Sequence, residues 1–264
     1  MRKITIQAVL FLILSTYLPV RSMAWGMLGH RIVGKIADSY LSEKARAEIK
    51  KILGNESIAM ASNWADFIKS DTAYKYLDPW HYIDFPGAMD YAAMRNYLKN
   101  DTAADAYTKI NFLVKELKRK TLAKDKKLMY LRLLIHIVGD VHQPLHVSPE
   151  GTMGGNDIKV TWFGQNSNLH RIWDEQLIDN QRLSYTEYVD AINFTTPAQR
   201  IKWQKQSVSQ WLYDSYQISV QLHNEIKADT KLGYLYHYKH LKTLNEQLLK
   251  GGVHLAGLLN EIFG

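Results

Sequence analysis

The sequence predicts an all-α fold: one mostly helical domain with a small β-hairpin near residues 155–165. Two observations lead to this prediction. Apolar residues recur at a helical period through most of the chain. Only the segment 151–168 departs from that period, because it is rich in Gly and Asn and alternates apolar with polar side chains around Val160.

The first 24 residues have the pattern of a secretory signal peptide. Two basic residues precede an apolar run over 8–17, and a small-residue cleavage site ends at Ala24. The run is shorter than the ~20 residues that a membrane-spanning helix needs. We therefore expect cleavage after Ala24, a single domain over 25–264 with no membrane anchor, and a secreted or periplasmic location.

The composition excludes some kinds of site. The chain has no cysteine, so a nucleophile or a zinc site built on thiolate is excluded. The formal net charge is +7, and it falls to +4 once the three basic residues of the signal segment are removed. This mild excess permits a polyanionic partner without demonstrating one. The sequence implies no stable protein partner.

The helical period predicts the remaining elements in chain order. A first helix covers 30–53 and stops at Gly54, and a second covers 102–120 and ends in a basic turn. Further helices are expected over 127–142, 169–179, 202–228 and 234–262.

Histidine and aspartate recur four residues apart in two of these helices. His136 and Asp140 would project from one helix face, about 40° apart in rotation, and His170 and Asp174 repeat the spacing. A proline then ends the first helix and lets His146 turn back toward the same space. A single His/Asp pair would be interpreted as a surface salt bridge. Two pairs among apolar residues favour a zinc site, because charges buried without partners are costly.

Further candidates lie upstream, and they are considered only because the two His/Asp pairs are present. Asp66 and Lys69 lie in NWADFIK, and His81, Tyr82 and Asp84 lie in WHYIDFP. Alone, each could be a capping carboxylate or a core aromatic. Four other histidines are interpreted as surface or satisfied core residues: His223, His237, His240 and His254. His142 is interpreted as a neighbour of the metal site but not a ligand.

Taken together, these motifs resemble the zinc-dependent, single-strand-specific nucleases and 3′-nucleotidases of the S1/P1 type. The matching pieces occur in order over about three-fifths of the segment 25–264: Trp25 with His30, Trp64-Ala65-Asp66, His81, HxxxD at 136–140, QPLH at 143–146, GGN at 154–156 and NLHxxWD at 168–174. Each piece is weak alone, but the combination is specific. The resemblance implies the mostly helical fold that these nucleases share with zinc phospholipases C.

The resemblance also implies three Zn²⁺ ions at the bottom of a cleft. It assigns the ligands in three sets: Asp66, His81, His136 and Asp140; then His146, His170 and Asp174; then the free α-amine and carbonyl oxygen of Trp25 with His30 and Asp140. A hydroxide between two zinc ions would attack phosphorus, and the remaining zinc would stabilise the leaving 3′ oxygen, which gives 5′-phosphate products.

Further roles follow from the same resemblance. Asp66 would orient the attacking water, and Lys69 and Asn156 would meet the phosphate and its developing charge. Tyr82 would stack a nucleobase, Asp84 would read the base edge, and the substrate-binding GGN motif supplies Gly154, Gly155 and Asn156. Stacking demands an unpaired base, so the expected substrates are single-stranded DNA and RNA and 3′-nucleotides.

Two other functions compete with this interpretation. A zinc phospholipase C would share the N-terminal Trp and the HxxxD…H signature, but it uses glutamate at the position of Asp174. A metal-free secreted module that binds polyanions would leave the buried His/Asp pairs unexplained. Eukaryotic members of the nuclease family carry disulfides, so the absence of cysteine predicts a bacterial member.

Overall fold

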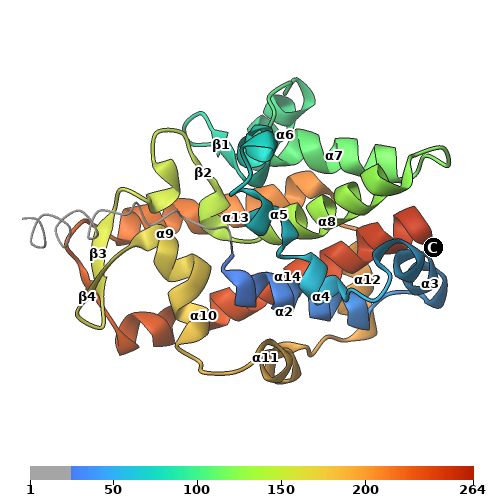
Figure 1. Cartoon of the computed structure of the whole chain (residues 1–264). Helices are drawn as coiled ribbons and strands as arrows, with labels where there is room; N and C mark the ends of the chain where they lie inside the picture. The colour runs from blue at the N-terminus through green and yellow to red at the C-terminus, as the bar shows by residue number, and fades with distance from the viewer. Residues whose placement is uncertain (1–24) are drawn as a thin grey trace, which may run out of the picture.

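A computed structural model of the chain describes residues 25–264. The expected signal peptide and its cleavage site lie outside these residues. The domain is mostly helical, with α2 (Met27–Ser39), α8 (Lys124–Asp140) and α14 (Tyr234–Phe263) packed on one another at its centre (Figure 1). The all-α prediction is therefore confirmed.

The remaining helices surround this centre. They are α3 (Glu43–Leu53), α4 (Ile58–Ala61), α5 (Trp64–Ile68), the 3₁₀ helix η1 (Thr72–His81), α6 (Tyr91–Lys99), α7 (Ala106–Leu117), η2 (Pro144–His146), η3 (Met153–Gly155), α9 (Leu169–Arg171), the π turn η4 (Ile172–Gln176), α10 (Leu177–Asp179), α11 (Tyr185–Ile192), α12 (Pro197–Gln204) and α13 (Val208–Glu225). Among the described residues, no helix combines the length and the apolar character that crossing a bilayer requires.

Two of the expected helices are each divided in two, so those predictions were wrong. The range 30–53 contains α2 and α3, and 202–228 contains the end of α12 and all of α13. Serine starts the second helix in both cases: the side chain of Ser42 accepts from Ala45 N, and that of Ser207 accepts from Gln210 N. The side chain of an N-cap serine satisfies a free N–H of the new helix, and this local signal interrupts a continuing apolar period.

The other four expected helices are confirmed with shifted ends. The segment 169–179 is continuous from α9 through α10, but its middle turn widens to the π turn η4. A π turn of this kind is often found at functional sites. It carries Asp174.

The expected hairpin is present near the predicted position. β3 (Lys159–Trp162) pairs antiparallel with β4 (Gln165–Asn168), and β5 (Lys231–Leu232) adds a parallel strand on the other side of β3. A second, parallel pair joins β1 (Ile83–Phe85) to β2 (Val147–Pro149). This pair sets the segment after His81 beside the segment after His146.

A close helix crossing fixes the position of α2. A Cβ added at Gly252 of α14 would lie 2.4 Å from Cβ of Ile36 on α2, so only glycine permits this approach. The crossing holds the buried face of α2, which carries His30, against the centre of the domain.

Candidate metal centre

Seven elements bring five histidines and three aspartates into one buried region at the centre of the fold. His30 comes from α2, Asp66 from α5, His81 from the end of η1, and the other five come from α8, η2, α9 and η4: His136, Asp140, His146, His170 and Asp174. All eight side chains are buried.

Asp140 lies at the centre of the first group. Its Oδ2 is 2.9 Å from His81 Nδ1 and 3.2 Å from His136 Nε2, whereas its Oδ1 is 3.3 Å from His30 Nε2. The two carboxylate oxygens thus face different histidines. One carboxylate in this position can serve two neighbouring ions.

Asp66 completes this group from the side of α5. Its Oδ1 is 3.6 Å from His136 Nε2 and 2.7 Å from Lys69 Nζ. Asp66, His30 and His136 each offer a ligand atom within 4.8 Å of the others, and so do His81, His136 and Asp140. His136 belongs to both of these sets and so connects Asp66 and His30 with His81 and Asp140.

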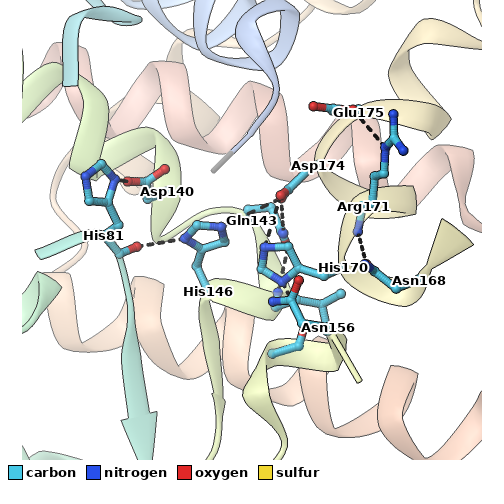
Figure 2. Close-up of polar contacts among 12 residues, drawn as sticks. His81, Asp140, Gln143, His146, Asn156, Asn168, His170, Arg171, Asp174 and Glu175 are labelled. Carbon is cyan, nitrogen blue, oxygen red and sulfur yellow. Dashed lines mark hydrogen bonds and ion pairs between the residues drawn. The ribbon is translucent and has the colours of Figure 1, made fainter. Parts of the chain in front are cut away.

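His146, His170 and Asp174 form a second group. Figure 2 shows His146 on the side of this group that faces His81 and Asp140. Asp174 Oδ2 is 3.0 Å from His170 Nε2, and Asp174 Oδ1 is 3.7 Å from His146 Nε2. Gln143 donates from Nε2 to Asp174 Oδ1 and accepts at Oε1 from Leu145 N. This amide holds the carboxylate in place.

Backbone carbonyl groups orient three of the histidines. Each of them has Nδ1 within hydrogen-bond distance of a carbonyl oxygen: His136 to Ser62 at 2.6 Å, His146 to His81 at 2.7 Å and His170 to Gly154 at 2.7 Å. Because a carbonyl oxygen only accepts, Nδ1 must carry the proton. The lone pair of each Nε2 is thereby directed into the cluster, as in metal-binding histidines.

The side chains fit a metal better than they fit one another. Buried atoms without a hydrogen-bond partner include one or both ring nitrogens of three histidines and one oxygen of each aspartate: His30, His81, His146, Asp66, Asp140 and Asp174. Ligands about 2.0–2.1 Å from a tetrahedral zinc lie about 3.3 Å apart. The separations of 2.9–3.7 Å within the two groups match that spacing.

The pKa values of His146 and Asp174 in the second group also favour a bound metal ion. Burial alone would lower the pKa of His146, but the hydrogen bond and charge of Asp174, with the charge of Asp140, raise it to about 9. Burial would raise the pKa of Asp174, but His170 and His146 lower it to about 2. The carboxylate thus stays ionised, and a metal ion binding here displaces a proton from His146.

A cavity of about 530 Å³ opens over these ligands. Its lining includes His81, His146 and His170 from the clusters and these further residues: Lys69, Lys75, Asp78, Tyr82, Asp84, Leu145, Met153, Gly154 and Asn156. The Tyr82 side chain is 45% exposed. Burial, with the charge of Glu150 nearby, raises the pKa of Asp84. The cavity combines a floor of candidate metal ligands with an aromatic and charged wall.

Two of the expected site residues lie neither in the cavity lining nor among the eight buried His and Asp side chains. Gly155 is buried against Leu169 and has φ +75, and its part in the structure is to shape the loop that presents Gly154 and Asn156. Trp25 is fully buried, and Gly26 N donates to Asp174 O at 2.8 Å. The start of the described chain is thus fastened to the turn that carries Asp174.

Sequence reasoning missed Gln143 and Lys75. Gln143 stands inside the QPLH motif, so the motif contained the signal, but only its histidine was given a role. Lys75 has no sequence signal of its own, because only the path of η1 brings it to the cavity.

The remaining histidines lie outside the two groups. His142 Nε2 is 2.6 Å from His254 Nδ1, and His240 Nε2 is 3.2 Å from Glu225 Oε1. These contacts agree with the interpretation of His240 and His254 as satisfied core residues and of His142 as a residue that is not a ligand.

The amino-acid sequence of this chain is similar to those of known nucleases. A model of the family S1/P1 Nuclease matches residues 25–264. The chain is 33% identical over 266 residues to Endonuclease 2 of Arabidopsis thaliana, covering 91% of both proteins. It is 29% identical over 268 residues to Nuclease P1 of Penicillium citrinum, covering 91% of this chain and 98% of the relative. Over 181 residues, 67% of this chain and 63% of the relative, it is 30% identical to Nuclease S1 of Aspergillus oryzae.

The family match favours a nuclease over the phospholipase C and over the metal-free binding module. These relatives come from a plant and from fungi, so the bacterial origin stays a prediction. A match over the whole described domain, together with His/Asp groups that can bind metal, leads to one conclusion: this chain belongs to the S1/P1 nuclease family, zinc-dependent hydrolases that act on phosphoester bonds.

Proposed function

We propose that this protein uses three zinc ions to hydrolyse single-stranded DNA, RNA and 3′-nucleotides at the P–O3′ bond, which leaves 5′-phosphate products. The observation that carries the proposal is the pair of buried His/Asp groups on the floor of a cavity whose wall offers a tyrosine, a lysine and an asparagine.

The proposed ligand sets use the residues of the two groups. The first zinc takes Asp66, His81, His136 and Asp140; the second takes His146, His170 and Asp174; the third takes His30, Asp140 and the α-amine and carbonyl oxygen of Trp25. The division of the Asp140 oxygens between His30 on one side and His81 and His136 on the other supports a shared ligand. Zinc bound here lowers the pKa of a water molecule toward about 7 and polarises the phosphate.

The protein's own residues act around the phosphorus. Burial would raise the pKa of Asp66, but His136 and Lys69 hold it below its usual range, so Asp66 is an ionised acceptor. Its Oδ1 faces Lys69, and its Oδ2 has no hydrogen-bond partner, so Oδ2 can accept a proton of the attacking water and orient it. Lys69 and Asn156, both at the cavity, stabilise the negative charge that grows on the phosphoryl oxygens.

Base recognition is assigned to the aromatic and charged wall of the cavity. The exposed ring of Tyr82 stacks on a nucleobase, and Asp84 accepts from the base edge. Gly154 supports this wall indirectly, because its carbonyl oxygen holds His170 and its position lets the loop approach Leu145. A base within a duplex cannot reach Tyr82, so single strands are preferred.

The experiment compares substrates with and without chelator. Zinc-loaded protein beginning at Trp25 receives single-stranded DNA, RNA, duplex DNA, a 3′-nucleotide and phosphatidylcholine. We expect chelator-sensitive cleavage of the single strands and the 3′-nucleotide, and end-labelling should find 5′-phosphates. Hydrolysis of phosphatidylcholine without cleavage of single strands would replace this proposal with a phospholipase C. Binding without hydrolysis, unaffected by chelator, would support the polyanion-binding module.

We propose in addition that export and cleavage after Ala24 complete the third zinc site, because only then does Trp25 carry a free α-amine. The fully buried Trp25 ring and the hydrogen bond from Gly26 N to Asp174 O support this role, since both fix the start of the domain beside the cluster. A protein that keeps one residue before Trp25 should bind two zinc ions, by elemental analysis, and melt close to the cleaved form. Three zinc ions in the extended protein would overturn the idea.

A further inference from the structure

A row of aromatic rings runs across four elements, and one of them, η1, also contributes residues to the cavity lining. Consecutive ring centroids lie 5.5–6.4 Å apart, mostly edge to face, from α5 through η1 to α7 and α8. We call this row the aromatic ladder, and its members are Trp64, Tyr74, Tyr76, Trp80, Phe112 and Tyr130. These elements pack together in the upper part of Figure 1.

Two rings of the ladder are exposed to solvent. Tyr76 is 54% exposed and Phe112 is 37% exposed, whereas Trp80 between them is 8% exposed. Because Trp80 touches both neighbours edge to face, it holds the two exposed rings on one surface.

This surface and the cavity share the helix η1. Tyr76 lies on η1 between Lys75 and Asp78, and both of these neighbours line the cavity. The same helix ends at His81, directly before Tyr82. A single-stranded substrate that continued from Tyr82 along η1 would reach Tyr76.

Cations accompany the exposed rings. Lys109 Nζ lies 4.9 Å from the centroid of Trp80 and 5.8 Å from that of Phe112. Lys75 is at the cavity rim, 3.5 Å from Asp78, and this pair is half exposed on both sides. Among the described residues, no carboxylate is in contact with Lys109, so it is available to a phosphate of a bound strand. A phosphate at Lys75 would compete with Asp78.

We propose that the exposed edge of the ladder, Tyr76 and Phe112 with Lys75 and Lys109, is an outer subsite for single-stranded nucleic acid. The rings stack bases of the strand beyond the nucleotide held at Tyr82, and the two lysines contact the phosphates between them. Alternating aromatic and basic groups are the recognition pattern for single strands without sequence preference. The inference rests on the proposed function and deepens it, because it adds a preference for substrates longer than a dinucleotide.

The test compares two substrate lengths in one variant. Tyr76→Ala/Phe112→Ala should raise KM for a 12-residue oligothymidylate about tenfold, which is the effect of losing one to two stacked bases. The kcat for this oligonucleotide and both constants for a dinucleotide should stay unchanged, because neither substituted ring touches the reacting groups. Tyr76→Phe keeps the stacking ring and should keep the KM.

Controls separate this role from a structural one. Tyr238→Ala removes an 82% exposed ring from α14 and should change neither substrate's KM. Melting temperatures report whether the double variant keeps its fold. An equal loss on both substrates, or no change in KM for the oligonucleotide, would overturn the outer subsite. Failure of the unmodified protein to cleave either substrate would instead overturn the proposed function.

Discussion

At the scale of single residues, the centre depends on side chains that hold the ligands as well as on the ligands. Gln143 is fully buried, and its amide spans Asp174 on one side and the backbone of Leu145 on the other. Leu145 immediately precedes His146. One side chain therefore couples the positions of two members of the second group.

Gln143→Ala should weaken zinc binding without removing a ligand. Loss of an amide that orients a metal-binding carboxylate typically costs about 10–100-fold in affinity. Competition with a chromophoric chelator measures the affinity, and Gln165→Ala, an exposed position of β4, is the matched control. Unchanged affinity in Gln143→Ala would show that Asp174 needs no such support.

Gly154→Ala should destabilise the protein more than Gly164→Ala does. Both glycines have positive φ, +55 and +80, where a side chain costs on the order of 1–2 kcal/mol. A Cβ at Gly154 would also lie 2.4 Å from Leu145 O, while a Cβ at Gly164 would meet nothing within 4 Å. Melting temperatures compare the two variants, and equal values would contradict the close approach at Gly154.

At the scale of elements, local rules explain what could be predicted. The pairs His136/Asp140 and His170/Asp174 follow from helix geometry alone, and the structure has each pair in contact. The breaks at Ser42 and Ser207 were missed because an apolar period can continue across a capped break. The meeting of His81 with Asp140, 59 residues apart, depends on the tertiary path of η1. Only the family resemblance suggested it.

The start of α7 should make stability depend on pH. Asp105 caps this helix by accepting from Thr108 N, and burial together with a hydrogen bond to Asp101 raises the pKa of Asp105 to about 7. A carboxyl group with a folded pKa above its unfolded value of about 3.9 stabilises the fold at low pH. This contribution is lost as the pH rises from about 4 to about 7.

Asp101→Asn removes the neighbouring charge, so the variant should melt at a higher temperature than the unmodified protein at pH 8. The difference should shrink at pH 5, where the Asp105 carboxyl group is protonated. Asp90→Asn is the control, because it removes a carboxylate charge at the start of another helix, α6. A difference independent of pH would contradict the coupling of Asp101 to Asp105.

At the scale of the whole molecule, the metal centre joins the parts of the fold. Its side chains come from helices between α2 and η4, so the ions would link segments from the first helix to the π turn. With no cysteine in the chain, no disulfide can replace that link. Metal binding and global stability should therefore be coupled.

Removal of zinc with a chelator should lower the melting temperature. At a free zinc concentration 100 times the dissociation constant, each site adds about 2.7 kcal/mol. For a domain of this size, that corresponds to roughly 5–10 °C per site. Calorimetry with and without chelator measures the shift, and restoring zinc should reverse it. Identical melting curves would show that the ions do not hold the fold together.

The carbonyl groups that orient His136, His146 and His170 have a consequence for how the sequence can vary. Every residue type supplies a carbonyl oxygen, so substitution at Ser62 leaves the acceptor for His136 in place. An insertion or deletion there would move the acceptor and turn the ring. The segment around position 62 should thus tolerate changes of residue type far better than changes of length.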